Sequence, residues 1–310
     1  MHPAFSIVFF TTLAGCAQGL VVALAVAVLA GLTLSPGFLG TALAVACGLL
    51  LGGLASSFLH LGRPERAWRA IMMWRTSWMS REVLLLPAFI GIVALWWLAL
   101  RADVGAGWQR LLPLAAILGA LLLWYCTAMI YACMRFIQEW AHPLTIINYT
   151  LIGLSSGLVL ACALAAALGE AGLLRAAAPW ALVATLVAWG TRAMALRRNA
   201  ALKPKSTLQS ATGIRNQHLV QKSMGMSAGS FNTREFFHGA SQVALRQVKL
   251  AFQLLGFALP AAALAWGLLG GPAWAWMLAL LLQVPGLVAE RWFFFAQAQH
   301  PQNLYYQSVS

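Results

Sequence analysis

Charged residues are scarce in this chain of 310 residues: 9% are Asp, Glu, Lys or Arg, and only seven are acidic. A soluble domain carries about 25% charged residues. Because 61% of the residues are hydrophobic, the chain has too few polar side chains to cover a water-exposed surface. The scarcity therefore excludes a soluble globular protein and predicts an integral membrane protein.

The sequence also lacks the Cys and His spacings that are typical of metal and haem sites. None of the five cysteines forms a C-x-x-C pair, so neither a zinc site nor an iron–sulfur cluster is predicted, and the cysteines are interpreted as small core hydrophobes. A b-type haem needs paired axial ligands within helices. His60 is the only histidine placed in an apolar run, at its end, so no haem is expected in this chain.

What the sequence does contain is long apolar runs. A membrane-spanning helix needs roughly 20 mainly apolar residues, and no segment shows the sustained alternation of a membrane β-barrel. The prediction is an all-α membrane protein of eight transmembrane helices in one bundle, with no β-sheet, over a single domain of residues 1–310. The expected spans are residues 6–34, 39–60, 83–100, 111–135, 144–168, 176–196, 250–270 and 272–297. Closely spaced small residues, as in Gly153-Leu-Ser-Ser-Gly157, suit tight helix packing in lipid.

The basic residues give an orientation. With eight spans, both termini share a side with loops 61–82 and 197–249, and this side carries 17 Lys and Arg against three on the other. The positive-inside rule therefore predicts cytoplasmic termini and large loops. An acidic partner that binds the basic loops would produce the same bias. The net charge of +13 does not indicate nucleic acid binding, because the basic residues lie between apolar runs.

One membrane boundary gathers residues that are costly in lipid. His60 closes the second span, Gly62 and Pro64 predict a turn after it, and Glu82 begins the third span on the same face. Arginines and tryptophans lie between them. These are the donors, proton-relaying groups, positive charges and flat apolar surface that a quinone headgroup needs, although simple interfacial anchoring would use many of the same residues. The predicted quinone site comprises His60, Leu61, Gly62, Arg63, Arg66, Trp68, Glu82 and Arg291. For Arg291 the alternative is a locally neutralised pair with Glu290.

The loop of residues 197–249 mixes Ser, Gly and Asn with phenylalanines and basic residues. This composition argues against a rigid fold and also against a purely solvated linker. The interpretation is a docking surface ordered by a partner, to which the uncharged tail of residues 299–306 adds.

The run His60-Leu-Gly-x-Pro-x-Arg66-Ala-Trp68, followed by Ser80-x-Glu82, resembles the membrane-anchor subunits of the dimethyl sulfoxide reductase family. The eight-helix layout and the Arg291-x-x-Phe294 element are similar too, so the resemblance covers the whole chain. It implies a complex with a molybdopterin catalytic subunit and a four-cluster iron–sulfur subunit, in which the anchor exchanges electrons with ubiquinone or menaquinone. The chain departs from the family in Arg63, where a small residue is common, and in its longer loop of residues 197–249.

The resemblance also implies roles for single residues. His60 would hydrogen-bond a quinone carbonyl, Arg66 would stabilise developing negative charge, and Glu82 would relay protons. A cytoplasmic face in a bacterial inner membrane is similar to the branch of sulfite dehydrogenases that pass electrons from sulfite to quinone, whereas dimethyl sulfoxide reductases have a periplasmic catalytic face. The alternatives are a quinol-oxidising anchor of an S-oxide or oxyanion reductase and, from another class, a secondary transporter. A transporter predicts internal repeats and charge at mid-membrane, and neither is found in the sequence.

Overall fold

The computed structural model describes residues 1–59, 61–102, 106–223 and 235–306. Within these ranges it contains eight helical segments long and apolar enough to cross a membrane, and no strand. The eight spans are α1 (Phe5–Leu29), α2 (Pro36–Phe58), α3 (Trp78–Ala99), α4 (Ala106–Ala132), α5 (Pro143–Leu168), α6 (Ala171–Ala200), α9 continued by η2 and α10 (Gln242–Gln253, Leu254–Ala258 and Leu259–Leu268), and α11 (Trp274–Ala296). The prediction of an all-α membrane protein with eight spans is confirmed.

The predicted boundaries were wrong mainly where a helix continues beyond its apolar run. The seventh span begins at Gln242, eight residues before the predicted start at residue 250, because the Ser241 side chain caps the helix by accepting from the Ala244 N–H. Helix α6 likewise extends from Ala171 to Ala200 and carries Arg197 and Arg198 in its last turn. Lys and Arg in such end turns place their charges in the interface while the backbone stays helical.

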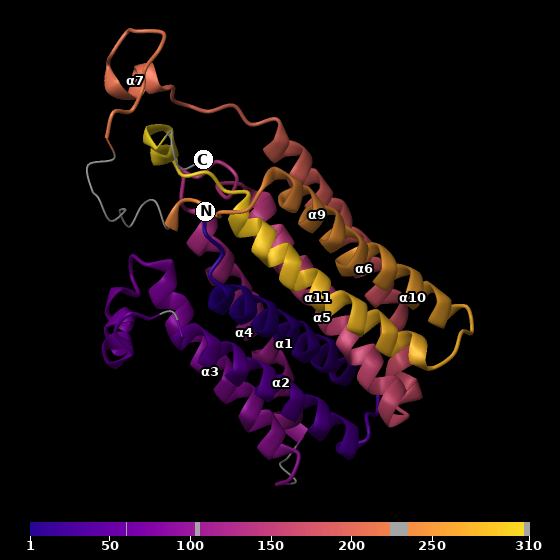
Figure 1. Cartoon of the computed structure of the whole chain (residues 1–310). Helices are drawn as coiled ribbons and strands as arrows, with labels where there is room; N and C mark the ends of the chain where they lie inside the picture. The colour runs from indigo at the N-terminus through magenta and orange to yellow at the C-terminus, as the bar shows by residue number, and fades with distance from the viewer. Residues whose placement is uncertain (60, 103–105, 224–234, 307–310) are drawn as a thin grey trace.

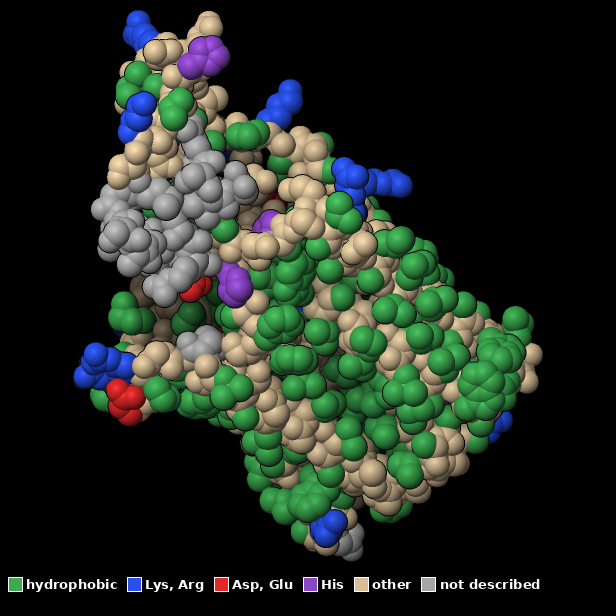
Figure 2. Space-filling model, in the orientation of Figure 1, with side chains coloured by type: hydrophobic (Ala, Val, Ile, Leu, Met, Phe, Trp, Pro, Cys, Tyr) green, Lys and Arg blue, Asp and Glu red, His purple; other side chains and the backbone are tan. Residues whose placement is uncertain are grey.

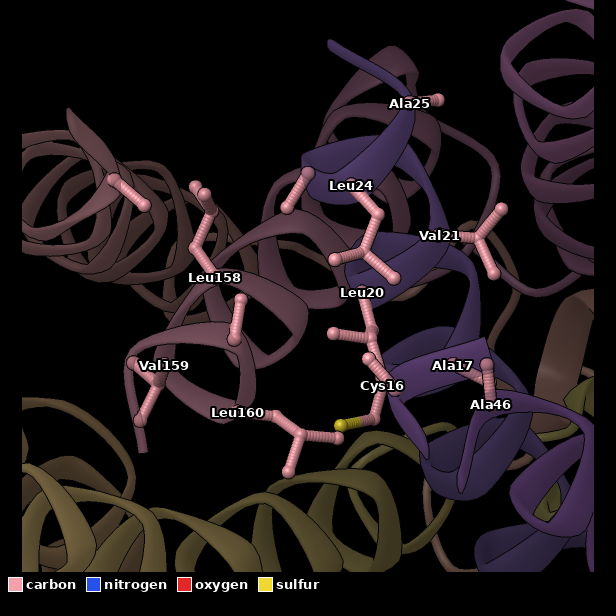
Figure 3. Close-up of a cluster of buried hydrophobic side chains, with 14 of the residues drawn as sticks. Cys16, Ala17, Leu20, Val21, Leu24, Ala25, Ala46, Leu158, Val159 and Leu160 are labelled. Atoms are coloured by element: carbon pink, nitrogen blue, oxygen red, sulfur yellow. The ribbon is translucent and has the colours of Figure 1, made fainter. Parts of the chain in front are cut away.

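Helices α1 and α5 pack against each other at the centre of the bundle (Figure 1). Helices α2, α3 and α4 lie on one side of this pair, and α6, α9, α10 and α11 lie on the other. The central contact is made by small and aliphatic side chains. Cys16, Leu20 and Leu24 of α1 belong to the same buried cluster as Leu158 and Leu160 of α5, and the Leu160 side chain points toward Cys16 (Figure 3).

Glycines let the backbones of α1 and α5 touch. A Cβ atom on Gly19 would overlap the Gly153 carbonyl, and one on Gly157 would overlap the backbone of Gly19 and Leu20. Close backbone approach of this kind drives association in lipid, where apolar burial supplies no advantage over lipid contact. The tight packing predicted for the Gly153–Gly157 motif is therefore confirmed.

The seventh span contains a π-helical turn, η2, between α9 and α10. Pro260 follows directly and lacks the N–H that an α-helix would bond to residue 256, which explains why the helix widens here. The widened turn brings Gly256 against Gly286 of α11, where a side chain on Gly286 would overlap the Gly256 backbone.

Most charged side chains gather at one end of the bundle. Both termini, the segment before α3 and the α6–α9 connection lie at this end (Figure 1). Figure 2 shows basic and histidine side chains concentrated here and a nearly uncharged apolar flank beside them. The same view shows this end hollowed between two projecting parts of the molecule. We refer to it below as the loop-bearing end.

Candidate functional site

The motif before α3 forms an exposed 3-10 helix, η1 (Pro64–Met73). His60 lies outside the described residues, so its predicted role stays a prediction. The other five motif residues of the predicted site are at the surface or nearly so: Leu61, Gly62, Arg63, Arg66 and Trp68. Among the described residues, Arg66 pairs with the neighbouring Glu65, at 3.9 Å between Nε and Oε1, with both side chains more than half exposed.

The segment around η1 presents much apolar surface for a loop. Its exposed apolar side chains are Leu59, Leu61, Trp68, Ile71, Met72, Met73 and Trp74. Arginines lie over its aromatic rings, with Arg81 Cζ 4.1 Å from the centre of the Trp78 ring and Arg69 Cζ 5.6 Å from that of Trp68. A mixture of tryptophan, aliphatic side chains and arginine is typical of a segment that lies in the membrane interface. The segment is therefore placed where a lipid-soluble molecule would meet the loop-bearing end.

Glu82 lies about one turn inside α3 and is buried, with 8% of its surface exposed. The Ser77 side chain caps α3 by accepting from the Ser80 N–H, which fixes where the helix starts and hence which way residue 82 faces. Thr127 of α4 donates a hydrogen bond to Glu82 Oε1. A carboxyl group held inside a membrane bundle by a single hydroxyl is costly, and such residues are functional candidates.

Arg291 is also buried, within a group of three charges. Glu290 Oε2 lies 3.1 Å from Arg291 Nε, and Glu290 Oε1 lies 2.6 Å from Nε of Arg192 on α6. The Arg291 guanidinium lies 4.0 Å above the centre of the Tyr149 ring on α5. The predicted pair of Glu290 and Arg291 is thus part of a charged triad that ties α11 to α6, and its third member, Arg192, was not singled out in the sequence analysis.

A small pocket with a cavity volume of about 20 Å³ lies between α1, α4, α5 and α11, and most of its lining is apolar. Arg291 lines it, and so does Thr127, the partner of Glu82, whereas Glu82 is not among its lining residues. Gln18 and Trp124 also line it, and their Oε1 and Nε1 atoms are buried without a hydrogen-bond partner among the described residues. Unpartnered polar atoms around a pocket of this kind suit ordered water. Glu82 is therefore one hydrogen bond away from the pocket that Arg291 lines.

The predicted site residues do not all meet at that space. None of Leu61, Gly62, Arg63, Arg66 and Trp68 is among the described residues that line the pocket. The predicted residues thus divide into an interfacial part before α3 and a buried part within the bundle. The sequence analysis missed Gln18, Trp124 and Thr127 in the buried part. The sequence did contain a signal for Gln18, because a polar amide inside an apolar run is costly and therefore marks a candidate functional residue.

The termini and the long connection form one surface at the loop-bearing end. The Met1 amino group donates to the Ala298 carbonyl at 2.7 Å, and Asn303 Nδ2 donates to the Phe236 carbonyl at 3.2 Å. The His300 ring stacks on Phe236 with ring centres 3.7 Å apart. The tail therefore lies with the long loop as the sequence analysis expected, while the part of that loop from residue 224 to 234 lies outside the described residues. That a partner docks there stays a prediction.

The stacking of His300 leads to a pH prediction. Partial burial and, secondly, the charge of the amino terminus lower the pKa of His300 below its ordinary value of 6.5. The folded tail therefore binds a proton less well than the released tail, so its docking weakens as the pH falls below about 6.5 and is unaffected above that value. We expect lower hydrogen-exchange protection in residues 298–306 at a pH of about 5.5 than at about 7.5. His300→Phe, which keeps an aromatic ring and cannot titrate, should lose most of this difference; an equal difference in the variant would contradict the assignment.

No group of three His, Cys, Asp or Glu side chains suited to a metal ion occurs in the part of the chain that the structure describes. The five cysteines are free, and Cys16, Cys126 and Cys162 are buried. Cys16 and Cys162 belong to the main apolar core, which agrees with their interpretation as small core hydrophobes. That interpretation is wrong for Cys133, which is exposed.

Comparisons with known proteins assign the chain to a family. Residues 1–224 match the family model described as DMSO reductase anchor subunit (DmsC). The chain is also similar to a subunit of the sulfite dehydrogenase of Allochromatium vinosum, with 46% identity over an alignment that covers all of both chains. The family model matches more than half of the chain, and the relative is similar over its full length. Both findings are consistent with the eight-helix membrane bundle. This multi-pass membrane protein therefore belongs to the family of DMSO reductase anchor subunits.

Proposed function

We propose that this chain is the membrane anchor and quinone-reactive subunit of a molybdenum oxidoreductase complex that oxidises sulfite and reduces quinone. The observation that carries the quinone assignment is the buried Glu82, about one turn inside α3, which accepts a hydrogen bond from Thr127 in the wall of the interior pocket. The full-length similarity to a subunit of a sulfite dehydrogenase supports the substrate of the complex.

Reduction of a quinone consumes protons together with electrons, so the anchor must deliver protons to a site inside lipid. In the proposed site Glu82 holds a proton near the interface and exchanges it with water of the interior pocket. His60 and Arg66 bind the polar head of the quinone from the motif segment. The exposed Trp68, Met72 and Met73 offer an apolar surface to its tail. The electrons are supplied by a four-cluster iron–sulfur subunit docked on the loop-bearing end, which in turn receives them from a molybdopterin catalytic subunit.

The proposed orientation puts the loop-bearing end in the cytoplasm of a bacterial inner membrane. The 17 basic residues on that side, against three on the other, support it. Protons taken up at Glu82 would then come from the same side as those released by sulfite oxidation, so this subunit would not build a proton gradient. The second candidate function is a quinol-oxidising anchor, for which the loop-bearing end would face the periplasm. The family assignment leaves the transporter alternative without support.

The test uses the intact complex purified from membranes, assayed for sulfite-dependent reduction of a quinone and, separately, of a soluble dye. We expect Glu82→Gln to lower the quinone activity by roughly 100-fold, the scale of a lost proton-transfer group, while dye reduction by the partner subunits stays near wild type. His60→Ala should likewise lower quinone reduction while dye reduction stays near wild type. Glu170→Gln is the matched control, because this partly exposed carboxylate accepts a hydrogen bond from Ser35 at the opposite end of the bundle.

Two results would contradict the proposal. Sulfite activity absent from the wild-type complex with either acceptor would remove the sulfite assignment and favour the quinol-oxidising alternative. Quinone activity retained in both Glu82→Gln and His60→Ala would place the quinone elsewhere in the bundle.

A further inference from the structure

A second pocket, distinct from the one beside Glu82, lies at the loop-bearing end between the start of α5, the last part of α6 and α11. It is small and partly open to solvent. The polar side chains that matter most in its wall are His142, Asn148, Arg192, Arg198, Asn199 and Arg291. Three of these six residues are arginines. The carboxylate of Glu139 also lines the pocket and is its acidic counterpart at the rim.

The buried charges beside this pocket do not balance. Glu290 is shared by Arg192 and Arg291, so the triad carries one excess positive charge, and its three side chains are each 4% exposed or less. Uncompensated charge is expensive in such surroundings. Arg192 Nε lies 2.6 Å from Glu290 Oε1, but neither Nε nor Nη2 of this buried guanidinium makes a hydrogen bond of good geometry to a described residue. A donor of this kind in the wall of a pocket indicates a missing acceptor.

The rest of the wall adds to the positive potential. Helix α5 begins at Pro143, and its amino-terminal end presents the positive pole of the helix dipole. His142 caps this end by accepting from the Leu144 N–H. Partial burial and then the charge of Arg198 lower the pKa of His142 below its ordinary value of 6.5. Glu139 is the opposing group in the wall.

We infer that this pocket binds a phosphate-type oxyanion, which accepts from Arg192 Nη2 and neutralises the excess charge of the Arg192–Glu290–Arg291 triad. The ligand is either the phosphate of an anionic phospholipid headgroup or free inorganic phosphate, since both present the same tetrahedral acceptor. Guanidinium groups and helix amino termini are the partners that such an anion prefers. The site shares Arg291 with the predicted quinone site but involves neither Glu82 nor the motif before α3.

The test is ligand protection of the purified protein in delipidated, phosphate-free detergent. Thermal unfolding is followed by alkylation of the buried Cys16, Cys126 and Cys162, which react only when the bundle opens. Inorganic phosphate is compared with chloride at equal ionic strength, and micelles containing phosphatidylglycerol are compared with micelles containing phosphatidylcholine. We expect the unfolding midpoint to rise with phosphate, with phosphatidylglycerol, or with both, in a saturable way.

Two variants make the result specific to the pocket. Arg192→Gln removes the excess charge and leaves Glu290 paired with Arg291, and Asn199→Asp places a carboxylate in the pocket beside Arg198. Both should abolish the protection. Arg197→Gln alters an exposed arginine that does not line the pocket and should keep it.

The pattern of protection decides the outcome. Protection by phosphatidylglycerol alone identifies a lipid headgroup as the ligand, and protection by inorganic phosphate identifies the free ion. Absence of protection by either probe in the wild type would overturn the inference. Protection that survives in both Arg192→Gln and Asn199→Asp would overturn it as well, because the anion would then bind elsewhere.

Discussion

Replacement of Glu290 by Gln is expected to destabilise the bundle by about 3–5 kcal/mol, the scale of breaking a buried ion pair from one side. Glu290 is the acidic member of a triad in which its carboxylate oxygens lie 2.6 Å from Arg192 Nε and 3.1 Å from Arg291 Nε. Without that carboxylate, two buried guanidinium groups repel each other, and each loses its partner.

The matched comparison is Arg192→Gln, which deletes the same 2.6 Å contact from the other side. Here Glu290 keeps Arg291 as its partner, so a neutral pair remains and the loss should be much smaller. Both variants can be compared by the midpoint of cysteine alkylation, since the three buried cysteines report opening of the bundle. Equal losses of stability in the two variants would mean that the Arg192–Glu290 contact alone matters and not the balance of charge in the triad. A larger loss in Arg192→Gln would contradict the argument altogether.

The fold could be predicted because membrane insertion reduces it to a one-dimensional pattern. Each span is an apolar run of about 20 residues or more, and in lipid the backbone must satisfy its own hydrogen bonds within a helix. The first and last residues of each helix were less predictable. Helix α9 begins outside its apolar run because a capping serine and amphipathic residues extend it, and composition alone does not reveal where such an extension begins.

The candidate site could be predicted only in part, for a different reason. Glu82 and Arg291 stood out because charge near a span is costly, and both lie buried in the bundle. Their partners, Thr127 and Arg192, come from other helices. Which helix faces they share depends on how eight spans are arranged, and the hydropathy pattern of each span does not contain that information. Arg192 lies well inside α6, because this helix continues to Ala200, four residues beyond the predicted end of the sixth span at residue 196.

The contact between α1 and α5 yields the second prediction of large effect. Gly157→Ala adds one methyl group, yet that methyl would overlap the backbone of Gly19 and Leu20, which cannot rotate away as a side chain could. Overpacking of a well-packed core typically costs about 1–3 kcal/mol, and here the cost falls at the central helix pair. We expect a marked drop in the alkylation midpoint and a lower yield of folded protein from membranes.

Gly190→Ala is the control that separates packing from helix propensity. Gly190 lies inside α6, faces outward and has open space where a Cβ atom would be. Alanine is favoured over glycine in a helix interior by up to about 1 kcal/mol, so this variant should be neutral or slightly stabilising. Gly157→Ala gains the same propensity, and any loss it shows therefore measures the steric conflict alone. If Gly157→Ala were as stable as Gly190→Ala, the two central helices would not be in backbone contact, and the arrangement of the bundle around α1 and α5 would be wrong.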